Sequence, residues 1–332
     1  MKAMMFKKVG TPLQMMEVPT PVPGPDQLLI QVHACGICRT DLHIIDGELP
    51  NPKLPLILGH EIVGTIMAKG QNVNDFTLGD RVGIPWLAST CSQCKFCLEG
   101  KENLCADALY TGYTVDGGFA EFCLANPDYV FPIPDKFDDL QAAPLLCAGL
   151  IGFRSYRKIK QTKNIGFYGF GSSAHILIQI ARQEGKNIYV FSRPGQKKPQ
   201  DLAVKLGAVW IGDSTQLPPI PLDAAIIFAP AGELIPAALK AIDKGGSVIC
   251  AGIHMSDIPA FPYHLLWGER SLASIANLTR LDGLEFMDMA KKTVIETTIT
   301  SYPLEKANEA LKDVREGRIA GTAVLDLRTT PS

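Results

Sequence analysis

The chain has 332 residues, of which 46% are hydrophobic and 20% charged. This balance is typical of a globular protein and leaves room for two domains with separate cores. The 32 basic and 34 acidic residues are mixed along the sequence and give a formal charge of -2. No basic arm or acidic tail therefore indicates nucleic acid or a membrane surface as a partner, and we expect a small-molecule ligand.

The start of the sequence, MKAMMFKK, lacks the apolar stretch and small-residue cleavage site of an export signal. The longest apolar stretches, such as the one around 142–153, are too short to cross a bilayer. We therefore expect a cytoplasmic protein. In that reducing compartment, an odd count of nine cysteines favours metal binding over a disulfide framework.

Two different sequence rhythms divide the chain. The first 150 residues are rich in glycine, proline and short apolar runs such as 28–32 and 62–67, which predicts a compact β-rich domain with many turns. From about Asn164 an apolar run at 165–168, helical spacing at 176–181 and another run at 188–191 follow one another. This alternation predicts an α/β fold with a parallel sheet covered by helices.

The α/β rhythm continues to about residue 276. Helices are predicted over 200–206 and 234–242, and strands over 209–211, 222–229, 247–251 and 271–276. After Asp282 two helical patterns and two strand-like stretches, 298–304 and 322–327, remain. The sequence alone does not assign these last elements to either domain.

One loop holds four of the cysteines, Cys91, Cys94, Cys97 and Cys105, at the spacing C-x2-C-x2-C-x7-C. Four thiolates in a sharply turning loop satisfy the tetrahedral coordination of zinc and leave no open position, so this site is predicted to stabilise a loop and to perform no chemistry. Two disulfides are disfavoured by compartment. An iron–sulfur cluster is disfavoured because the last gap is long and no proline follows Cys105.

Three further candidate ligands are scattered: Cys38 in CGICRTDLH, His60 in GHE, and Cys147 in AAPLLCAGL. A lone cysteine in an apolar run is usually a small core residue, and a lone histidine is more often an ordinary hydrogen-bonded group than a ligand. The polar residues beside these three candidates are suited to orienting metal ligands and passing a proton, and they favour a metal site with a proton path. These neighbours are Thr40, Asp41, His43 and Glu61.

The order CGICRTDLH, GHEIVGT, four-cysteine loop, Cys147 and glycine-rich turn resembles the zinc-containing medium-chain alcohol dehydrogenases over essentially the whole chain. Stretches such as TGYTVDGGFAEF, APLLCAGLIGFR, YGFGSSAH and AGIHMSDIPAF are most similar to its bacterial propanol-preferring or cinnamyl-alcohol-dehydrogenase-like branch.

The resemblance implies roles for the scattered residues. Cys38, His60 and Cys147 would bind a catalytic zinc, a ligand set described for alcohol dehydrogenase in general. Thr40 would hydrogen-bond the substrate hydroxyl and pass its proton towards His43, because a hydroxyl both donates and accepts and an imidazole titrates near neutrality. In addition, Asp41 would orient the His60 ring and Glu61 would lie behind the zinc.

A glycine-rich turn, Gly169-Phe-Gly171, follows a predicted strand and opens a helix with Ser172 and Ser173. This context permits close approach of the backbone to a pyrophosphate at the helix N-terminus. The resemblance also implies that Arg39 contacts the pyrophosphate.

The end of the next strand bears on the choice of cofactor. Where an NAD enzyme usually carries Asp or Glu for the ribose hydroxyls, this chain has Ser192 and Arg193, followed by Lys197 and Lys198. A serine and an arginine can bind a 2′-phosphate that a carboxylate would repel, so NADP(H) is predicted in preference to NAD(H). Ile253 is a further candidate for the cofactor pocket.

Two positions depart from the family pattern. Thr322 stands where many members carry an arginine that contacts the pyrophosphate. Ile151 stands where many have a threonine near the nicotinamide. The resemblance further implies a GroES-like catalytic domain over 1–148 and 287–332, a Rossmann dinucleotide-binding domain over 149–286, two zinc ions per chain, and a homodimer or homotetramer.

The resulting hypothesis is a zinc-dependent oxidoreductase that transfers a hydride between a primary alcohol or aldehyde and NADP(H). A polyol dehydrogenase is one alternative, disfavoured because that branch is expected to have a glutamate in place of Cys147. The other alternative is a non-catalytic, cofactor-binding redox sensor. It is disfavoured because Cys38, His60, Cys147, Thr40 and His43 are all present.

Overall fold

A computed structural model describes residues 1–319 and 321–328, and its contacts divide the chain into two compact units. The first is Met1–Leu150, Asn277–Lys292 and Thr297–Ser332, and the second is Ile151–Ala276 and Thr293–Glu296. The domain limits predicted above stay a prediction; residues 277–286, placed in the dinucleotide-binding domain there, lie in the first contact unit. Residues 320 and 329–332 of the predicted catalytic domain lie outside the described residues.

The central strand of the first unit is β3 (Leu28–Ile37), which pairs with three other strands. Its sequence LLIQVHACGI alternates in burial at first and is fully buried over its last four residues, so the chain enters α1 (Arg39–Ile45) from inside the core. The sheet has the order β10, β6, β5, β3, β18 and β17, with β9 also paired to β3. The bounds of these strands are β5 (Glu61–Lys69), β6 (Arg81–Ile84), β9 (Phe122–Ala125), β10 (Phe131–Pro132), β17 (Ile299–Pro303) and β18 (Thr322–Asp326).

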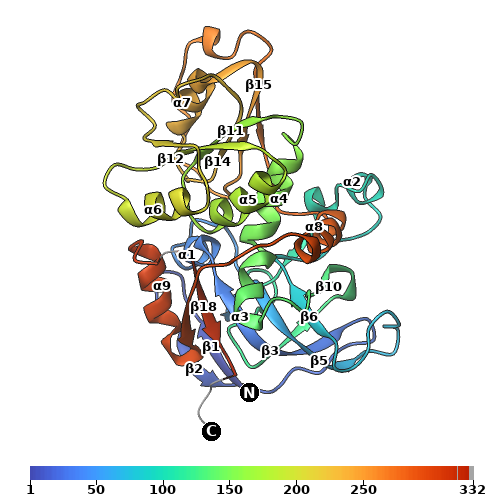
Figure 1. Cartoon of the computed structure of the whole chain (residues 1–332). Helices are drawn as coiled ribbons and strands as arrows, with labels where there is room; N and C mark the ends of the chain where they lie inside the picture. The colour runs from blue at the N-terminus through green and yellow to red at the C-terminus, as the bar shows by residue number, and fades with distance from the viewer. Residues whose placement is uncertain (320, 329–332) are drawn as a thin grey trace. The chain divides into compact units, whose positions relative to one another are not determined.

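The two C-terminal strands belong to the same sheet as β3. Antiparallel pairing places Leu325 of β18 opposite Cys35 of β3, and β17 runs parallel to β18. Both strands were predicted, over 298–304 and 322–327, and both are confirmed. The sequence did not assign these strands to a domain, and the structure places both in the first unit (Figure 1).

The rest of the first unit is short elements around this sheet. A three-stranded sheet contains β2, β1 and β4, and a two-stranded one contains β7 and β8. The strand bounds are β1 (Lys2–Phe6), β2 (Gln14–Glu17), β4 (Leu56–Ile57), β7 (Leu87–Ser89) and β8 (Leu109–Tyr110). The α-helices are α2 (Lys95–Leu98), α3 (Asp139–Ala142), α8 (Arg280–Lys292) and α9 (Ala307–Arg315), and the 3-10 turns are η1 (Glu102–Leu104), η2 (Pro127–Tyr129), η3 (Ala143–Leu146) and η5 (Leu304–Lys306). Helix α4 (Ala148–Arg157) continues into the second unit.

The second unit is built on a six-stranded parallel sheet with the order β13, β12, β11, β14, β15 and β16. The strands are β11 (Asn164–Tyr168), β12 (Asn187–Phe191), β13 (Trp210–Gly212), β14 (Leu222–Ile227), β15 (Ile242–Cys250) and β16 (Ser271–Ser274). The helices are α5 (Ser172–Gln183), α6 (Lys197–Lys205) and α7 (Leu234–Ala241), and η4 (Tyr263–Leu265) is a 3-10 turn. In chain order this is the doubly wound arrangement 3-2-1-4-5-6 of a Rossmann sheet, so the predicted fold class is confirmed.

The Rossmann sheet has its topological switch point between β11 and β14. These strands are adjacent and parallel, with Tyr168 opposite Ile227 at their carboxyl ends. From there the chain winds outward in both directions, and Figure 1 shows α7 on one side of the sheet and α5 and α6 on the other. Dinucleotides bind beyond the carboxyl ends of strands at such a point, which is where Gly169 follows β11.

A polar cluster around Asp139 joins separate segments of the first unit. Nδ1 of His33 lies 3.1 Å from Oδ2 of Asp139, and Nε of Arg81 donates to its Oδ1 at 2.6 Å. Arg328, just beyond β18, lies 3.8 Å from the same carboxylate. The hydrogen bond with His33 and the ion pair with Arg81 together lower the pKa of Asp139 to about 2. The carboxylate thus ties β3, β6 and α3 together.

We expect Asp139→Asn to lower the free energy of unfolding at pH 7 by about 2 kcal/mol, because Arg81 would lose a partly buried charged partner. The carboxylate has a lower pKa folded than unfolded, so its stabilisation is fully present above pH ~4 and is lost as pH falls towards 2. Urea titrations at pH 7 and pH 3 measure both effects. The control is Asp135→Asn on the exposed residue nearby; equal stability of the two variants at pH 7 would contradict the prediction.

Candidate active site

Four potential metal-binding side chains converge at the end of β3. One ligand atom from each of Cys38, His60, Glu61 and Cys147 lies within 4.8 Å of the others. The two sulfur atoms of Cys38 and Cys147 are 3.8 Å apart although the residues are 109 positions apart in sequence. The structure therefore brings together the three residues predicted as ligands of a catalytic zinc, with Glu61 beside them.

A single carboxylate, that of Asp41, fixes the positions of Cys38 and His60. Cys38 precedes α1 as its N-cap, and its backbone N–H donates to Oδ2 of Asp41 at 2.8 Å. The other oxygen accepts from the backbone N–H of Gly59 at 3.3 Å and lies 3.5 Å from Nδ1 of His60. Asp41 is fully buried beside the His60 ring, and its predicted role in orienting that ring stays a prediction.

Two glycines make room for the cluster. Gly36 pairs with Glu61 across β3 and β5, and a Cβ on Gly36 would lie only 2.0 Å from Oε2 of Glu61. Gly59 has φ +96°, and a Cβ there would lie 2.4 Å from the Phe119 ring. Both positions therefore exclude a side chain, which lets the carboxyl of Glu61 reach the site and the chain turn sharply before His60.

The cluster combines acidic groups with burial. A hydrogen bond from Cys147, together with His60 nearby, holds the pKa of the Cys38 thiol well below its usual range, and the same contact raises the pKa of Cys147. Burial and the neighbouring Cys38 raise the pKa of Glu61. Within the described residues, neither ring nitrogen of His60 nor Oε2 of Glu61 has a hydrogen-bond partner, although buried polar atoms nearly always have one.

Thr40 and His43 lie one turn apart on α1, so that both fall on the same side of the helix. Oγ1 of Thr40 is 3.6 Å from the sulfur of Cys38, and the residue is 8% exposed. The side chain of His43 is 12% exposed, and its Nδ1 contacts Oε2 of Glu48 at hydrogen-bonding distance. Glu48 was not singled out from the sequence; an acidic residue in the turn after a helix is too common to be a signal.

Aromatic rings border His60. The ring of Trp86 meets it edge-on at a centroid distance of 4.9 Å. Tyr110 and Tyr113 stack on Trp86 at 5.3 and 5.6 Å. Tyr113 was not identified from the sequence either, because its position in the chain gives no sign that it stacks on Trp86.

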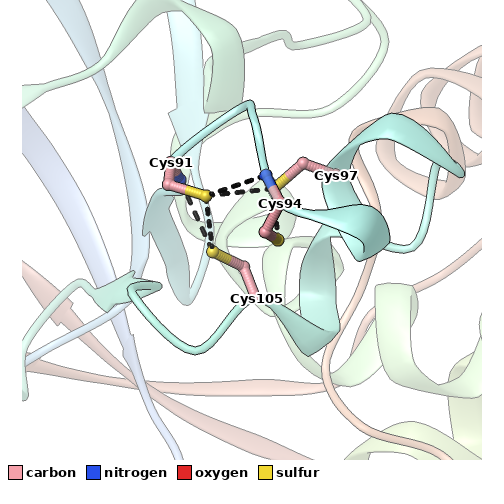
Figure 2. A group of neighbouring side chains, drawn as sticks. All are labelled: Cys91, Cys94, Cys97 and Cys105. Atoms are coloured by element: carbon pink, nitrogen blue, oxygen red, sulfur yellow. Dashed lines mark hydrogen bonds between the residues drawn. The ribbon is translucent and has the colours of Figure 1, made fainter.

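The four-cysteine loop surrounds the short helix α2, and Figure 2 shows its sulfur atoms pointing towards one another. All four lie within 4.8 Å of one another. Cys91 is 3.9 Å from Cys97 and 3.5 Å from Cys105, sulfur to sulfur. Hydrogen bonds from the backbone of Gln93 and Cys94 lower the pKa of Cys91 to about 7. The predicted set of four is thus arranged around a common centre.

The glycine turn of the second unit has the predicted conformation. Gly169 has φ +93°, a region that favours glycine, and a Cβ there would lie 3.1 Å from the backbone nitrogen of Ala229. Gly171 is the N-cap of α5, with open space where a Cβ would be. Ser172 and Ser173 form the first turn of α5. The backbone N–H groups of a helix start therefore lie beside the switch point.

The residues predicted to choose the cofactor lie beyond the carboxyl ends of β12 and β15. Ser192 is 7% exposed and its hydroxyl accepts from Gln200 at 2.8 Å. Arg193 and Lys198 are exposed, Lys197 forms an exposed ion pair with Asp201, and Ile253 is 53% exposed.

The structure also shows where Arg39, the remaining predicted cofactor contact, and the two departures from the family pattern lie. Arg39 is exposed at the first position of α1 in the first unit. Thr322 is a buried residue that begins β18. Ile151 is half-buried in α4, where its carbonyl accepts from Ser155.

Comparison with known proteins independently supports the family resemblance seen in the sequence. Residues 24–135 match the family model described as alcohol dehydrogenase GroES-like domain. The chain is 45% identical over 322 residues to the probable alcohol dehydrogenase AdhA of Mycobacterium tuberculosis, covering 95% of this chain and 92% of that one.

Solved structures agree over the full length. A cinnamyl alcohol dehydrogenase from Sorghum bicolor has a TM-score of 0.92 at 25% identity and covers 99% of this chain and 98% of its own. The CAD from Helicobacter pylori, complexed with NADP(H), has 0.90 at 25% and covers 99% of each chain. Acetophenone reductase from Geotrichum candidum, in complex with NAD, has 0.88 at 26% and covers 98% and 96%.

Within the described residues, no helix is both long and apolar enough to cross a membrane. The two-unit fold, the GroES-like domain, the full-length similarity and the converging cysteine and histidine ligands all lead to one assignment. The chain belongs to the zinc-containing medium-chain alcohol dehydrogenase family.

Proposed function

We propose that this alcohol dehydrogenase transfers a hydride between a primary alcohol or aldehyde and NADP(H). In this proposal Cys38, His60 and Cys147 hold a catalytic zinc, and Thr40 and His43 relay the proton. The observation that carries the proposal is the convergence of those three ligand atoms within 4.8 Å of one another and of Glu61.

The donor set fits zinc on chemical grounds. Two sulfurs and one imidazole nitrogen are ligands that zinc prefers, and three protein ligands leave a position for a small molecule. Nδ1 of His60 lies 3.5 Å from Asp41, and a metal would provide the partner that the described residues do not give Nε2. When bound, zinc supplies a Lewis acid that polarises the substrate oxygen.

The chain's own groups would manage the proton. Thr40 is close enough to Cys38 to hydrogen-bond a hydroxyl held beside the cluster, and its hydroxyl can donate and accept at once. His43 lies one turn further along α1 and is nearer to solvent. Its imidazole can accept the proton during alcohol oxidation and return it during aldehyde reduction.

Cofactor choice follows from the end of β12. The 2′-phosphate of NADP(H) needs cationic partners and repels a carboxylate, and here Ser192 and Arg193 stand where NAD enzymes usually carry Asp or Glu. Lys197 is a further cation within the same exposed segment. When bound, the nicotinamide supplies or accepts the hydride, and the glycine turn with Ser172 and Ser173 would hold the pyrophosphate.

A second zinc in the four-cysteine loop completes the proposal. Four sulfurs close the coordination sphere, so this site would stabilise the loop 91–105 and take no part in the reaction. The homodimeric or homotetrameric state and the cytoplasmic location stay predictions; light scattering of the purified protein tests the first.

Metal analysis is expected to give two zinc ions per chain. Cys147→Ser should retain one zinc and lose at least about 100-fold in kcat/KM, because losing a ligand exceeds the cost of losing an outer-shell partner. Cys94→Ser should retain one zinc and melt at a lower temperature, because it removes a loop ligand. Atomic emission and thermal melts measure both. A single zinc in the wild type, lost only in Cys94→Ser, would instead support the redox sensor.

Arg193→Ala is expected to reduce the preference for NADPH over NADH, measured as a ratio of kcat/KM values, by about 10- to 100-fold. A charge-assisted hydrogen bond contributes about 1.5–3 kcal/mol, and each 1.4 kcal/mol is tenfold. The control is Arg182→Ala, an exposed arginine in the last turn of α5, which should leave the ratio unchanged. An Arg193→Ala enzyme that keeps its preference for NADPH would contradict the assignment.

The substrate class is tested by reduction of short aliphatic, long aliphatic and aromatic aldehydes with NADPH, and by oxidation of the corresponding alcohols and of a polyol with NADP⁺. We expect kcat/KM to be highest for an apolar aldehyde, because Trp86 and two stacked tyrosines border His60. Higher activity with the polyol would support the polyol dehydrogenase alternative.

A further inference from the structure

We propose that Glu48 is a positioning residue for this reaction, whose carboxylate holds His43 so that its Nε2 is the proton acceptor. The inference rests on the proposed relay through His43. Its basis is the contact between Nδ1 of His43 and Oε2 of Glu48, a residue in the turn that follows α1.

The contact lies between protein and solvent. The side chain of His43 is 12% exposed, whereas that of Glu48 is 42% exposed. His43 is therefore mostly enclosed, with Glu48 on the side of the ring that faces solvent. An ordinary surface ion pair would have both partners exposed, as Lys197 and Asp201 are at 85% and 63%.

Backbone hydrogen bonds hold Glu48 under the helix end. The N–H of Glu48 donates to the carbonyl of His43 at 2.9 Å, and the N–H of Gly47 donates to that of Ile44 at 3.2 Å. Gly47 has φ +77°, which allows this sharp reversal after the helix. The pairing of Glu48 with His43 is therefore built into the C-terminal turn of α1.

The residues that follow Glu48 are also held by hydrogen bonds. The hydroxyl of Tyr113 donates to the carbonyl of Pro50, and the N–H of Lys53 donates to the carbonyl of Tyr113 at 2.9 Å. Lys53 also forms an ion pair with Asp116. Since Tyr113 stacks on Trp86 beside His60, the turn that carries Glu48 is fixed to the same aromatic group that borders the metal ligand.

The chemistry follows from the tautomers of imidazole. A carboxylate at Nδ1 favours the form with its proton on Nδ1, which leaves a lone pair on Nε2. When Nε2 accepts a proton, the ring becomes an imidazolium and the carboxylate stabilises its charge; the proton then passes to water. In aldehyde reduction the same imidazolium donates from Nε2, so no other reactant is needed.

Two other charged side chains belong to α1 or to the turn after it. Asp46, the second carboxylate of the turn, accepts two hydrogen bonds from Arg315 of α9 at 2.8 and 2.9 Å. Arg39 lies at the exposed opposite end of α1. Asp46 thus provides a matched control, a carboxylate two residues from Glu48 whose partner is an arginine.

The test measures kcat and KM for alcohol oxidation against pH in the zinc-loaded enzyme with saturating NADP⁺. Glu48→Gln keeps an acceptor for Nδ1–H but removes the charge, so the acid-side inflection should move about 0.5 pH unit lower. Glu48→Ala removes both and should also lower the plateau kcat about threefold to tenfold, with KM within about twofold. Glu48→Asp should recover part of the lost rate.

Asp46→Asn should leave the pH profile and plateau unchanged, and thermal melts check that all variants fold. The inference is overturned if Glu48→Ala and Glu48→Gln have the profile of Asp46→Asn. His43→Gln separates this failure from that of the relay. If His43→Gln lowers kcat tenfold while Glu48→Ala has no effect, only the role of Glu48 is wrong. If His43→Gln also has no effect, the relay itself is wrong. In the His43→Gln background, Glu48→Ala should cause no further loss.

Discussion

The buried carboxylate of Asp41 is the contact on which the active site depends. It accepts from the backbone of Cys38 at the start of α1 and from the backbone of Gly59, and it lies against the ring of His60. Burying a carboxylate is costly unless its oxygens are hydrogen-bonded, and here both oxygens are. One residue therefore stabilises the helix that carries Thr40 and His43 and also fixes the distance between two of the candidate ligands.

Strand register supplies the other half of the geometry. Because Gly36 pairs with Glu61, Cys38 follows two residues beyond the pair on one strand and His60 precedes it by one on the other. A slip of one residue would turn the carboxyl of Glu61 to the opposite face of the sheet and bring a side chain against it. The glycine at 36 and the pairing of β3 with β5 are thus as much part of the site as its ligands.

Sequence reasoning succeeded where the determining interactions are local. Short spacing sufficed for the four-cysteine loop, and the turn at Gly169 with its flanking periodicity sufficed for the Rossmann unit. It was insufficient where distant segments meet: β17 and β18 join a sheet whose central strand lies nearly 300 residues earlier. The contact of Glu48 with His43 and the stacking of Tyr113 on Trp86 depend on side chains in loops. Loop sequences have no periodic pattern from which such contacts could be predicted.

The two cysteine clusters differ in what their surroundings require. Three of the loop cysteines are partly exposed and Cys105 is buried, and all four lie within one short stretch of chain, so their arrangement is a matter of local backbone geometry. Cys38 and Cys147 instead lie close to Asp41 and Glu61, both buried, with His60 as the nearby basic group. Acidic groups crowded in a medium of low dielectric retain protons unless a cation compensates them. Burial and the neighbouring Cys38 therefore raise the pKa of Glu61, and the hydrogen bond with Cys38, together with burial, raises that of Cys147. Metal binding at such a site releases protons. A metal at the deeper cluster would therefore have to displace the protons that the surroundings hold on Cys147 and His60.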